Sequence, residues 1–523
     1  MLKLRYILSL SVLILGIICS NSYAQESKRI EFPAPGNENS NLVISLGNEG
    51  VLMVSKASRE QLLVNKIDTI LASGWQKVID MEQNLTFIDH TIDNRDVYLL
   101  MGKDGSTSFQ LYKISTGIGL VQKFNIETLS RFELSLFKVF NQTVYFGGSV
   151  KEEPVLLMVS LERPIPKVIA GNFKSTASIQ SLDFDYENEL LLVSYTFKEN
   201  KKNQIMLRKY SSLGKVIEQT IFEPSEEYSL ITGKVFRGKN GSEYMVGNYG
   251  LRGAGTNGTP ISQGIYISKI ENRQVVFLNY YNFTDFKNFF NYMSVKQQEK
   301  IEKQIEKRKD KGKDLHLNYR VLVHDIKEVD NKILLSADVF IPEYRTNNNY
   351  YGSPFGYSTM YSPTSFYFNP LNRYYGLNSW AWNPYSYGYN RNNQIFDGFR
   401  YTHAIITQFD EAGKMLWDNS ISYNNFKTFE LKQKLIVQPI RDDVYKLAYT
   451  NQGKLNIQVI EEDKLILAPR AITIQTENEV EKIKETAYEN ADFWYDNHFL
   501  VYGEQKVAGE KNRKVFFINK ISF

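Results

Sequence analysis

The hydrophobic positions of this chain fall into apolar runs of five to eight residues, separated by turns rich in Gly, Asn, Asp and Ser. Runs of this length with partial alternation, bounded by such turns, predict antiparallel β-strands. One pattern recurs, in which a polar turn is followed by an apolar strand that ends at a small residue. Its eight copies begin at Val51, Val97, Val144, Leu190, Tyr244, Ile333, Val444 and Phe499.

Successive copies are 46, 47, 46, 54, 89, 111 and 55 residues apart. The two long intervals each contain an insertion, at residues 284–314 and 346–396. Without these 31 and 51 residues, the intervals become 58 and 60. A repeat of this length, with one further apolar run before each turn and two after the copy, is typical of four-stranded β-propeller blades. We predict an all-β propeller of eight blades, with seven blades or another all-β fold as alternatives.

Two details extend this prediction. The small residues that end the copies are expected to let neighbouring blades approach closely; they are Ser55, Gly102, Gly148, Ser194, Gly247, Ala337, Ala448 and Gly503.

The last copy is one strand short, while residues 29–34 (RIEFPA) provide an apolar run before the first copy. We expect this N-terminal strand to complete the last blade, because ring closure removes an exposed strand edge.

The chain resembles exported bacterial β-propeller proteins as a class. The resemblance is carried by the repeat period and by turns such as Phe409 to Lys414 before Met415-Leu416-Trp417, which look like the D-x-x-G-K-x-L-W turns of repeat propellers. It covers nearly all of the chain after the leader. It implies a binding platform around a channel, with enzymes a minority, and no particular activity.

The first residues read as an export signal. Lys3 and Arg5 precede an apolar stretch at 7–18, which is too short to cross a bilayer core of about 30 Å. The small residues of Ser22-Tyr23-Ala24 predict cleavage before Gln25, so residues 1–24 are interpreted as a signal peptide. A lipoprotein signal that acylates Cys19 is the alternative, although Ile18 is bulky where such signals have a small residue.

The residues after the leader, 25–523, are predicted to form a single propeller domain without cysteine, because Cys19 is the only one in the chain. Hydrophobic content of 42% and charged content of 23% are those of a globular protein. A net charge of +4 is too small to indicate nucleic acid as a partner. No other apolar run reaches about 18 residues, so no transmembrane helix is predicted.

The insertion at 284–314 changes from a strand to a helix pattern. Ser294 and Gln297 form a capping-box pattern, and Ile301 and Ile305 lie on one helical face. Gly312 suits the end of the helix. The segment has nine Lys or Arg against six Asp or Glu. We interpret it as a solvated helix, packed through Phe286, Phe289, Phe290 and Met293, with docking to an acidic partner as the alternative.

The insertion at 346–396 has no Asp or Glu and carries fifteen aromatic residues between Tyr350 and Tyr389. Frequent Asn, Gly, Ser and Pro favour an irregular loop. Three interpretations remain open: a lid over the propeller, a partner-binding surface, and a low-complexity segment. As a binding surface it would use Tyr and Trp for contact with a protein or glycan. The candidate residues are Tyr350, Tyr351, Tyr374, Tyr375, Trp380, Trp382 and Tyr385.

The sequence offers little catalytic chemistry. The five histidines form no metalloprotease pattern, and His90 and His324, each beside an acid, are interpreted as hydrogen-bonded structural residues. No phosphate loop or calcium loop appears, and we predict no catalytic residue, metal or cofactor. Asp183, Asp185 and Glu187 alternate along a predicted strand, which would place three carboxylates on one face. These are the best sign of an enzyme, because a glycosidase needs two neighbouring carboxylates.

We therefore predict an exported, non-enzymatic binding or scaffold protein of the bacterial cell envelope, in the periplasm or at the cell surface. Its partner would be an envelope protein or a glycan, engaged through the loop insertions. The alternative is a propeller enzyme that acts on carbohydrate or peptide substrates.

Overall fold

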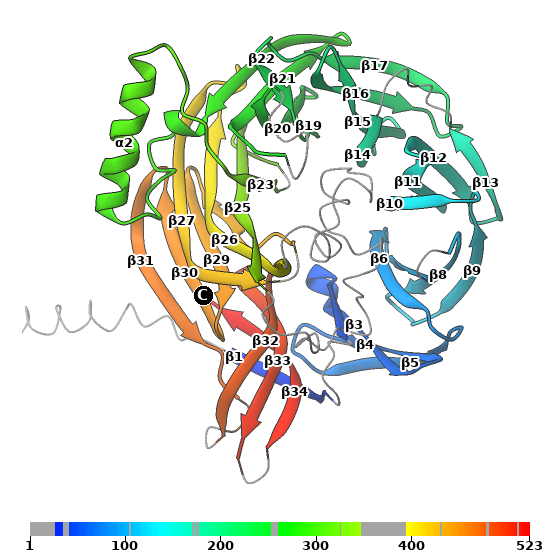
Figure 1. The fold of residues 1–523 in the computed structure, drawn as a ribbon. Helices are drawn as coiled ribbons and strands as arrows, with labels where there is room; N and C mark the ends of the chain where they lie inside the picture. Colours follow the sequence, from blue (N-terminus) through cyan, green and yellow to red (C-terminus); the bar gives the residue numbers. More distant parts are fainter. Residues whose placement is uncertain are drawn as a thin grey trace, which may run out of the picture.

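The computed structural model of this protein describes residues 27–34, 41–103, 106–169, 173, 177–252, 260–324, 326–346, 394–428, 431–476, 478, 481–509 and 512–523. The strands form eight antiparallel sheets, arranged as blades around a ring (Figure 1). The predicted eight-bladed, all-β propeller is therefore confirmed. Each of the eight copies starts at or next to the first residue of the second strand of a blade.

In blades 1 to 4 the strands follow one another outward from the ring centre (Figure 1). Blade 1 consists of β2 (Asn41–Ser45), β3 (Val51–Ser58), β4 (Gln61–Ile67) and β5 (Ser73–Asp80), with the 3-10 turn η1 (Gly47–Glu49) after β2. Blade 2 consists of β6 (Thr86–Asp93), β7 (Asp96–Gly102), β8 (Ser108–Ser115) and β9 (Val121–Glu127). Blade 3 consists of β10 (Phe132–Phe140), β11 (Thr143–Val150), β12 (Glu153–Ser160) and β13 (Arg163–Ile169). Blade 4 consists of β14 (Ala177–Asp185), β15 (Leu190–Glu199), β16 (Lys202–Tyr210) and β17 (Val216–Phe222).

In blades 5 and 6 the innermost strand is split into two short pieces that pair with the same second strand. Blade 5 consists of β18 (Tyr228–Leu230) and β19 (Lys234–Arg237), then β20 (Glu243–Leu251), β21 (Gly264–Glu271) and β22 (Gln274–Asn282). Blade 6 consists of β23 (Arg320–Val323) and β24 (Lys327–Val329), then β25 (Lys332–Thr346), β26 (Gln394–Phe409) and β27 (Met415–Thr428). Blade 7 consists of β28 (Ile436–Arg441), β29 (Val444–Asn451), β30 (Lys454–Glu461) and β31 (Lys464–Thr473).

Blade 8 joins the two ends of the described chain. It consists of β32 (Lys482–Tyr495), β33 (His498–Ala508), β34 (Arg513–Ser522) and, outermost, the N-terminal β1 (Ser27–Pro33). The pairing runs from Ser27 opposite Ile521 to Pro33 opposite Val515. The expected ring closure by an N-terminal strand is thus confirmed.

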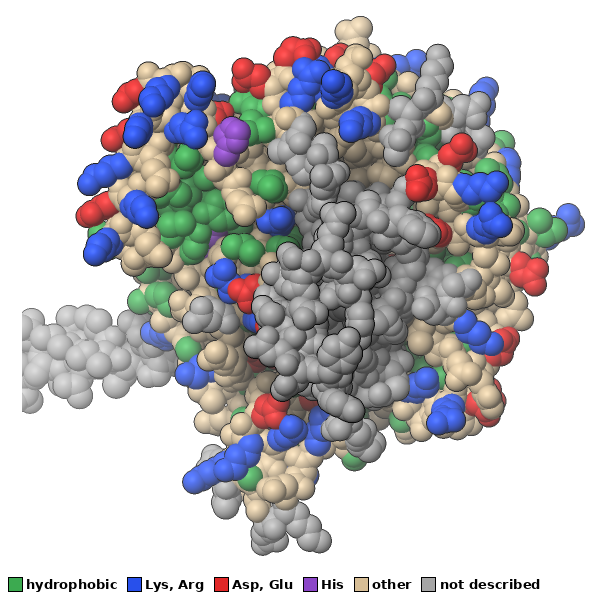
Figure 2. All heavy atoms as spheres, viewed as in Figure 1, with side chains coloured by type: hydrophobic (Ala, Val, Ile, Leu, Met, Phe, Trp, Pro, Cys, Tyr) green, Lys and Arg blue, Asp and Glu red, His purple; other side chains and the backbone are tan. Residues whose placement is uncertain are grey.

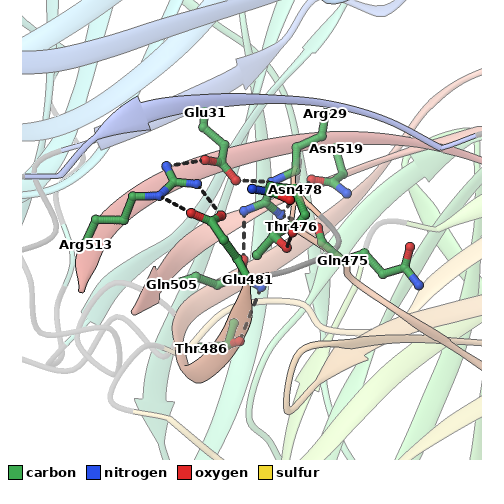
Figure 3. Close-up of polar contacts among 10 residues, drawn as sticks. All are labelled: Arg29, Glu31, Gln475, Thr476, Asn478, Glu481, Thr486, Gln505, Arg513 and Asn519. Carbon is green, nitrogen blue, oxygen red and sulfur yellow. Dashed lines mark hydrogen bonds and ion pairs between the residues drawn. The ribbon is translucent and has the colours of Figure 1, made fainter. Parts of the chain in front are cut away.

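The closing strand is also held by side chains (Figure 3). Arg29 donates hydrogen bonds to the Gln475 carbonyl and to Gln505, each at 2.8 Å, and its guanidinium lies 4.6 Å from the centre of the Phe517 ring. Glu31 lies between two arginines, 2.7 Å from Arg29 and 2.6 Å from Arg513. Both Arg29 and Glu31 have side chains that are almost fully buried, so solvent screens their pair less than a surface ion pair.

The hydrophobic core is divided into eight clusters, each located between two neighbouring blades. The second strands are therefore covered on both faces. For example, six consecutive residues of β7 are buried, whereas outermost β13 has one buried residue. A strand buried on both faces has a continuous apolar run instead of an alternating pattern, and this explains why the repeats could be recognised.

At two of the eight copies, the small residue at the end of the second strand serves a different purpose from the one expected. A Cβ atom at Gly148 would lie 2.2 Å from the carbonyl oxygen of Glu133, and one at Gly503 would lie 3.0 Å from Cα of Glu489. Both neighbours belong to the inner strand of the same blade, where the pairing contains a β-bulge. A bulge bends the strand that contains it. At these two positions the close approach is within a blade, whereas the Ser194 hydroxyl of blade 4 donates a hydrogen bond of 3.1 Å to the Gly233 carbonyl of blade 5.

The first insertion forms the only α-helix among the described residues, α2 (Val295–Lys309), after the 3-10 turn η2 (Phe283–Asp285). The capping box of Ser294 and Gln297 is present as predicted. The predicted aromatic contacts are also present, because Phe286, Phe289 and Phe290 are buried, with Met293 partly buried, in the cluster between blades 5 and 6. α2 lies at the outer rim of the ring (Figure 1).

His403 of β26 belongs to the same aromatic cluster. Its ring stacks on Tyr292 with centroids 4.2 Å apart and meets Phe289 edge-on at 4.7 Å. Burial lowers the pKa of His403 to about 3, so the ring is neutral at physiological pH. The insertion thus shares a well-packed core with the propeller.

The second insertion starts from a long hairpin. β25 and β26 remain paired as far as Thr346 opposite Gln394, which confirms that the two flanks of this insertion pair directly. First strands and second strands of a blade run in opposite directions. Because α2 lies between a fourth and a first strand, and the long hairpin joins a second to a third strand, both insertions leave the ring on the same face.

Candidate functional site

A pocket of about 500 Å³ lies between the innermost strands of blades 4, 5 and 6. β14, β19 and β23 lie near the centre of the ring (Figure 1). The pocket is formed where the first strands end, so it opens on the face opposite to the one from which the insertions leave. Its lining residues are Asp183, Phe184, Asp185, Tyr186, Glu187, Leu192, Lys234, Val235, Phe236, Arg237, Gly238, Lys239 and Ile326.

The pocket contains the three carboxylates that the sequence had suggested as the best sign of an enzyme. Asp183 and Asp185 are in β14, but this strand ends at Asp185, and Glu187 belongs to the following turn. Asp185 is buried, whereas Asp183 and Glu187 are exposed. The three carboxylates are therefore neighbours around one pocket, although they do not share one strand face as predicted.

Arg237, at the end of β19 in the next blade, forms ion pairs with this cluster. Its guanidinium pairs with Asp185 and lies 3.2 Å from Glu187. Asp185 also accepts hydrogen bonds from the backbone N–H of Glu187 and from the backbone and side chain of Asn188. Burial by itself raises the pKa of Asp185, but these hydrogen bonds and Arg237 outweigh it and hold the pKa below the ordinary value. Asp185 is thus ionised at neutral pH and cannot serve as a general acid.

An aromatic side chain stands beside this charged cluster. Tyr186 is 67% exposed, and its ring meets Phe140 edge-on with centroids 5.3 Å apart. Phe140 in turn stacks on Phe184 at 4.7 Å. Partial burial and the charges of Asp183 and Asp93 raise the pKa of Tyr186, which keeps its hydroxyl protonated. A supported aromatic ring beside charged groups can bind a ligand that has a flat face and polar substituents.

A second polar cluster has the residue types of a hydrolase triad. His324 Nε2 lies 2.8 Å from Asp338 Oδ2, and His324 Nδ1 lies 3.0 Å from Ser336 Oγ. Asp338 also accepts hydrogen bonds from the Tyr423 hydroxyl and, at 2.8 Å, from the backbone N–H of Lys434. All five residues are buried, and Asp338 is occupied by three donors.

This burial fits a structural role, as expected for His324. The cluster connects the inner and second strands of blade 6 with its outermost strand and with the segment that precedes blade 7. Its acid among the described residues is Asp338, and Asp325, the chain neighbour considered in the sequence, lies outside them. Among the described residues, no group of three His, Cys, Asp or Glu side chains is placed to hold a metal ion.

The base of the aromatic insertion is the hairpin of β25 and β26, and it is held in place by aromatic packing and by ion pairs. Phe340 meets Phe399 edge-on with ring centroids 5.6 Å apart, and both are fully buried. Nearer the tip, Glu343 pairs with Arg400 and, at 3.2 Å, with Lys427. Burial raises the pKa of Glu343, but these two cations lower it below the ordinary value. The stem is therefore an ordered support for the residues that it carries.

The seven predicted binding residues of this insertion lie outside the described residues. They are Tyr350, Tyr351, Tyr374, Tyr375, Trp380, Trp382 and Tyr385.

Sequence reasoning had not considered Arg237 or Tyr186 of the pocket. Arg237 could have been found by comparing repeats, since it ends the first strand of blade 5 much as Asp185 ends that of blade 4. Equivalent strand ends of adjacent blades are neighbours around the channel.

No protein-family model matches the chain, and no curated protein matches its sequence. Among solved structures, the chain is similar to a prolyl endopeptidase (9% identity, TM-score 0.39), with 90% of this chain and 55% of that chain covered. It is also similar to the polysaccharide lyase Uly1 (7% identity, TM-score 0.40, 83% and 89% covered). A third similar structure is the β-propeller domain of the Trilobed protease from Pyrococcus furiosus (9% identity, TM-score 0.32, 82% and 97% covered).

The chain thus spans about half the length of that prolyl endopeptidase. At these TM-scores the similarities carry no argument about activity. The class of the protein, an eight-bladed β-propeller, rests on its own strand order and pairing.

Proposed function

We propose that this protein is an exported, non-enzymatic binding protein of a bacterial cell envelope, which holds a protein or glycan through its two insertions. The observation that carries the proposal is the way in which the two insertions are attached to the propeller. α2 shares an aromatic core with blades 5 and 6, and the hairpin of β25 and β26 extends beyond the blade with buried aromatic rings and paired charges. A binding element on a rigid support loses less entropy when it binds.

Export is part of this proposal. We expect the protein isolated from the producing cells to begin at Gln25, because Ser22 and Ala24 provide the small side chains that signal peptidase needs. N-terminal sequencing of the mature protein measures this directly. A protein that starts at Cys19 and carries a labelled fatty acid would instead be a lipoprotein anchored in a membrane.

The binding role is tested by replacing residues 347–393 with a short Gly-Ser turn between Thr346 and Gln394. These two residues are paired in the structure, so a tight turn can join them, and closing a shorter loop costs little entropy. We expect a folded, soluble protein that no longer captures its partner from envelope extracts. The fold is checked by circular dichroism and by thermal unfolding.

Two other outcomes would contradict parts of the proposal. Unfolding of the shortened protein would show that residues 347–393 belong to the core. If a well-folded variant still captures the partner as well as the unmodified protein does, this insertion is not part of the binding site. The binding element is then α2.

The pocket favours a second candidate function, that of an enzyme acting on carbohydrate or peptide. Three carboxylates gather there beside a cavity, as such an enzyme requires. Against this, Arg237 forms ion pairs with two of them, and the lowered pKa of Asp185 removes the proton that a general acid would donate. Turnover of a saccharide or peptide that is lost in Asp183→Asn, with the fold intact, would establish the enzyme.

A further inference from the structure

The outward face of α2 carries four lysines in a straight row. Lys296, Lys300, Lys303 and Lys307 follow one another at intervals of four, three and four residues, which places them on one side of a helix. All four side chains are exposed. With a rise of about 1.5 Å per residue, the row extends over about 16 Å. We call these four residues the lysine row.

The direction of the lysine row is fixed by the opposite side of the helix. Ile301 and Ile305 pack against the cluster between blades 5 and 6, and they lie about half a turn from the row. An ion pair of 2.9 Å joins Lys309 to Asp285. The segment before the helix is fastened to β27, because Asp418 accepts hydrogen bonds from the backbone N–H groups of residues 287 and 288. The row therefore points away from the propeller.

Within the part of the chain that the structure describes, the charges of the row are unpaired. No ion pair or hydrogen bond of the four side chains is present among the described residues, although α2 contains three glutamates. Neighbouring lysines three and four residues apart repel one another and slightly destabilise the helix. Figure 2 shows Lys and Arg side chains gathered over α2 at the rim of the molecule. An anionic partner placed along the row would offset this repulsion, because each lysine would attract the negative charges of the partner.

The surroundings of the row indicate the shape of that partner. Glu299, Glu302 and Glu306 form a parallel row about a quarter of a turn away. A flat anionic surface, such as a membrane, would meet these carboxylates together with the lysines. In addition, Ile301 and Ile305 are partly buried against the propeller, and Val295 is the one exposed apolar side chain of the helix, which is too little to enter a bilayer. A narrow, linear polyanion can lie along the lysines and avoid the glutamates.

The chemistry of the row narrows the choice further. It contains neither Arg nor an aromatic residue, which are the usual anchors of protein interfaces. Arg and stacking aromatics are also typical of nucleic-acid sites, and the net charge of the chain is only +4. A lysine ammonium is a compact point charge without the bidentate fork of Arg, so a row of lysines suits a chain of separate anionic groups, such as the carboxylates or sulfates of a polysaccharide.

We propose that the lysine row of α2 binds a linear acidic polysaccharide, and that this contact holds the protein on an anionic glycan. This inference rests on the proposed binding function and names the chemistry of one partner. The four contacts are electrostatic and exposed, so binding by the row is weak and decreases as salt increases.

The test uses the full chain and polygalacturonate, a linear polyuronate, with neutral dextran as the comparison polymer. The variant is Lys296→Gln, Lys300→Gln, Lys303→Gln and Lys307→Gln combined, because Gln keeps the helix propensity and removes the charge. In affinity electrophoresis at about 50 mM salt, we expect the affinity for polygalacturonate to fall by about tenfold or more, as removal of four exposed charge contacts allows. Dextran should not retard either protein.

The matched control removes four exposed lysines elsewhere, at Lys151, Lys198, Lys201 and Lys215 of blades 3 and 4. It lowers the net charge equally, and we expect it to bind polygalacturonate almost as the unmodified protein does. A second variant, Glu299→Gln, Glu302→Gln and Glu306→Gln combined, should bind more tightly. Thermal unfolding monitors the fold of each variant.

Several outcomes would overturn the inference. Equal losses in the row variant and its control would show that only net charge matters. Tighter binding of the unmodified protein to phosphatidylglycerol vesicles or to duplex DNA, lost in the row variant, would identify a membrane or nucleic acid instead. If the row variant binds polygalacturonate normally but the protein still captures an envelope partner, this inference fails while the proposed binding function remains.

Discussion

Replacing Asp338 by alanine is expected to lower the free energy of unfolding by about 3 to 5 kcal/mol, the usual cost of removing one member of a buried charged cluster. Three donors converge on this carboxylate, from His324, the Tyr423 hydroxyl and the Lys434 backbone. Without it, all three are left in a site with almost no access to water, where each unpaired group is costly. Urea unfolding followed by tryptophan fluorescence measures the change.

Glu162→Ala is a suitable comparison, because Glu162 is exposed and such surface substitutions usually change stability by less than about 0.5 kcal/mol. Asp338→Asn separates charge from shape, since the amide oxygen can still accept hydrogen bonds. A loss below about 1 kcal/mol for Asp338→Ala would mean that water enters the cluster and replaces the carboxylate. The cluster would then not be the link between blades 6 and 7 that its contacts indicate.

Removal of the N-terminal strand is expected to have a still larger effect. A chain that begins at Asn41 lacks β1, so one edge of β34 becomes unpaired and Arg513 loses Glu31. We expect a loss of more than about 5 kcal/mol, which is comparable to the whole stability of many domains. Since an exposed edge invites pairing with other chains, size-exclusion chromatography should also show oligomers.

A chain that begins at Gln25 provides the control, because it keeps β1 and lacks only residues 1–24. It should unfold cooperatively and elute as the compact protein. A synthetic peptide of residues 25–34, added to the shorter chain, should raise its melting temperature by binding along β34. If the chain that begins at Asn41 unfolds with the same midpoint and cooperativity as the control, β1 does not stabilise the ring.

The two faces of the ring have different chemistry. One face carries the bases of both insertions. The first insertion contains the basic helix α2, and the second is the aromatic-rich segment. The other face has a pocket whose charged groups largely neutralise one another. Because of this separation, the proposed binding through the insertions and any ligand of the pocket can be tested independently.

The sequence by itself determined the repeated part of this protein. Each second strand is covered on both faces by neighbouring blades, so its apolar run is visible without knowledge of the fold. The polar turn before each run is equally local. The N-terminal strand could be assigned because the last copy lacked one strand, and the capping box of Ser294 and Gln297 is a signal of four residues. The apolar runs, the turns and the capping box depend on residues close together in the chain, and the N-terminal strand follows from counting the repeats.

The tertiary structure decided which distant residues meet. Arg237 reaches Asp185 from 52 positions away, because strand ends of adjacent blades converge at the channel. His324 finds Asp338 across a strand pair, whereas the sequence drew attention to its chain neighbour. The small residues at Gly148 and Gly503 accommodate bulges within their own blades, which no pattern of apolar and polar positions reveals. Packing around the ring, and not local sequence, selects these partners.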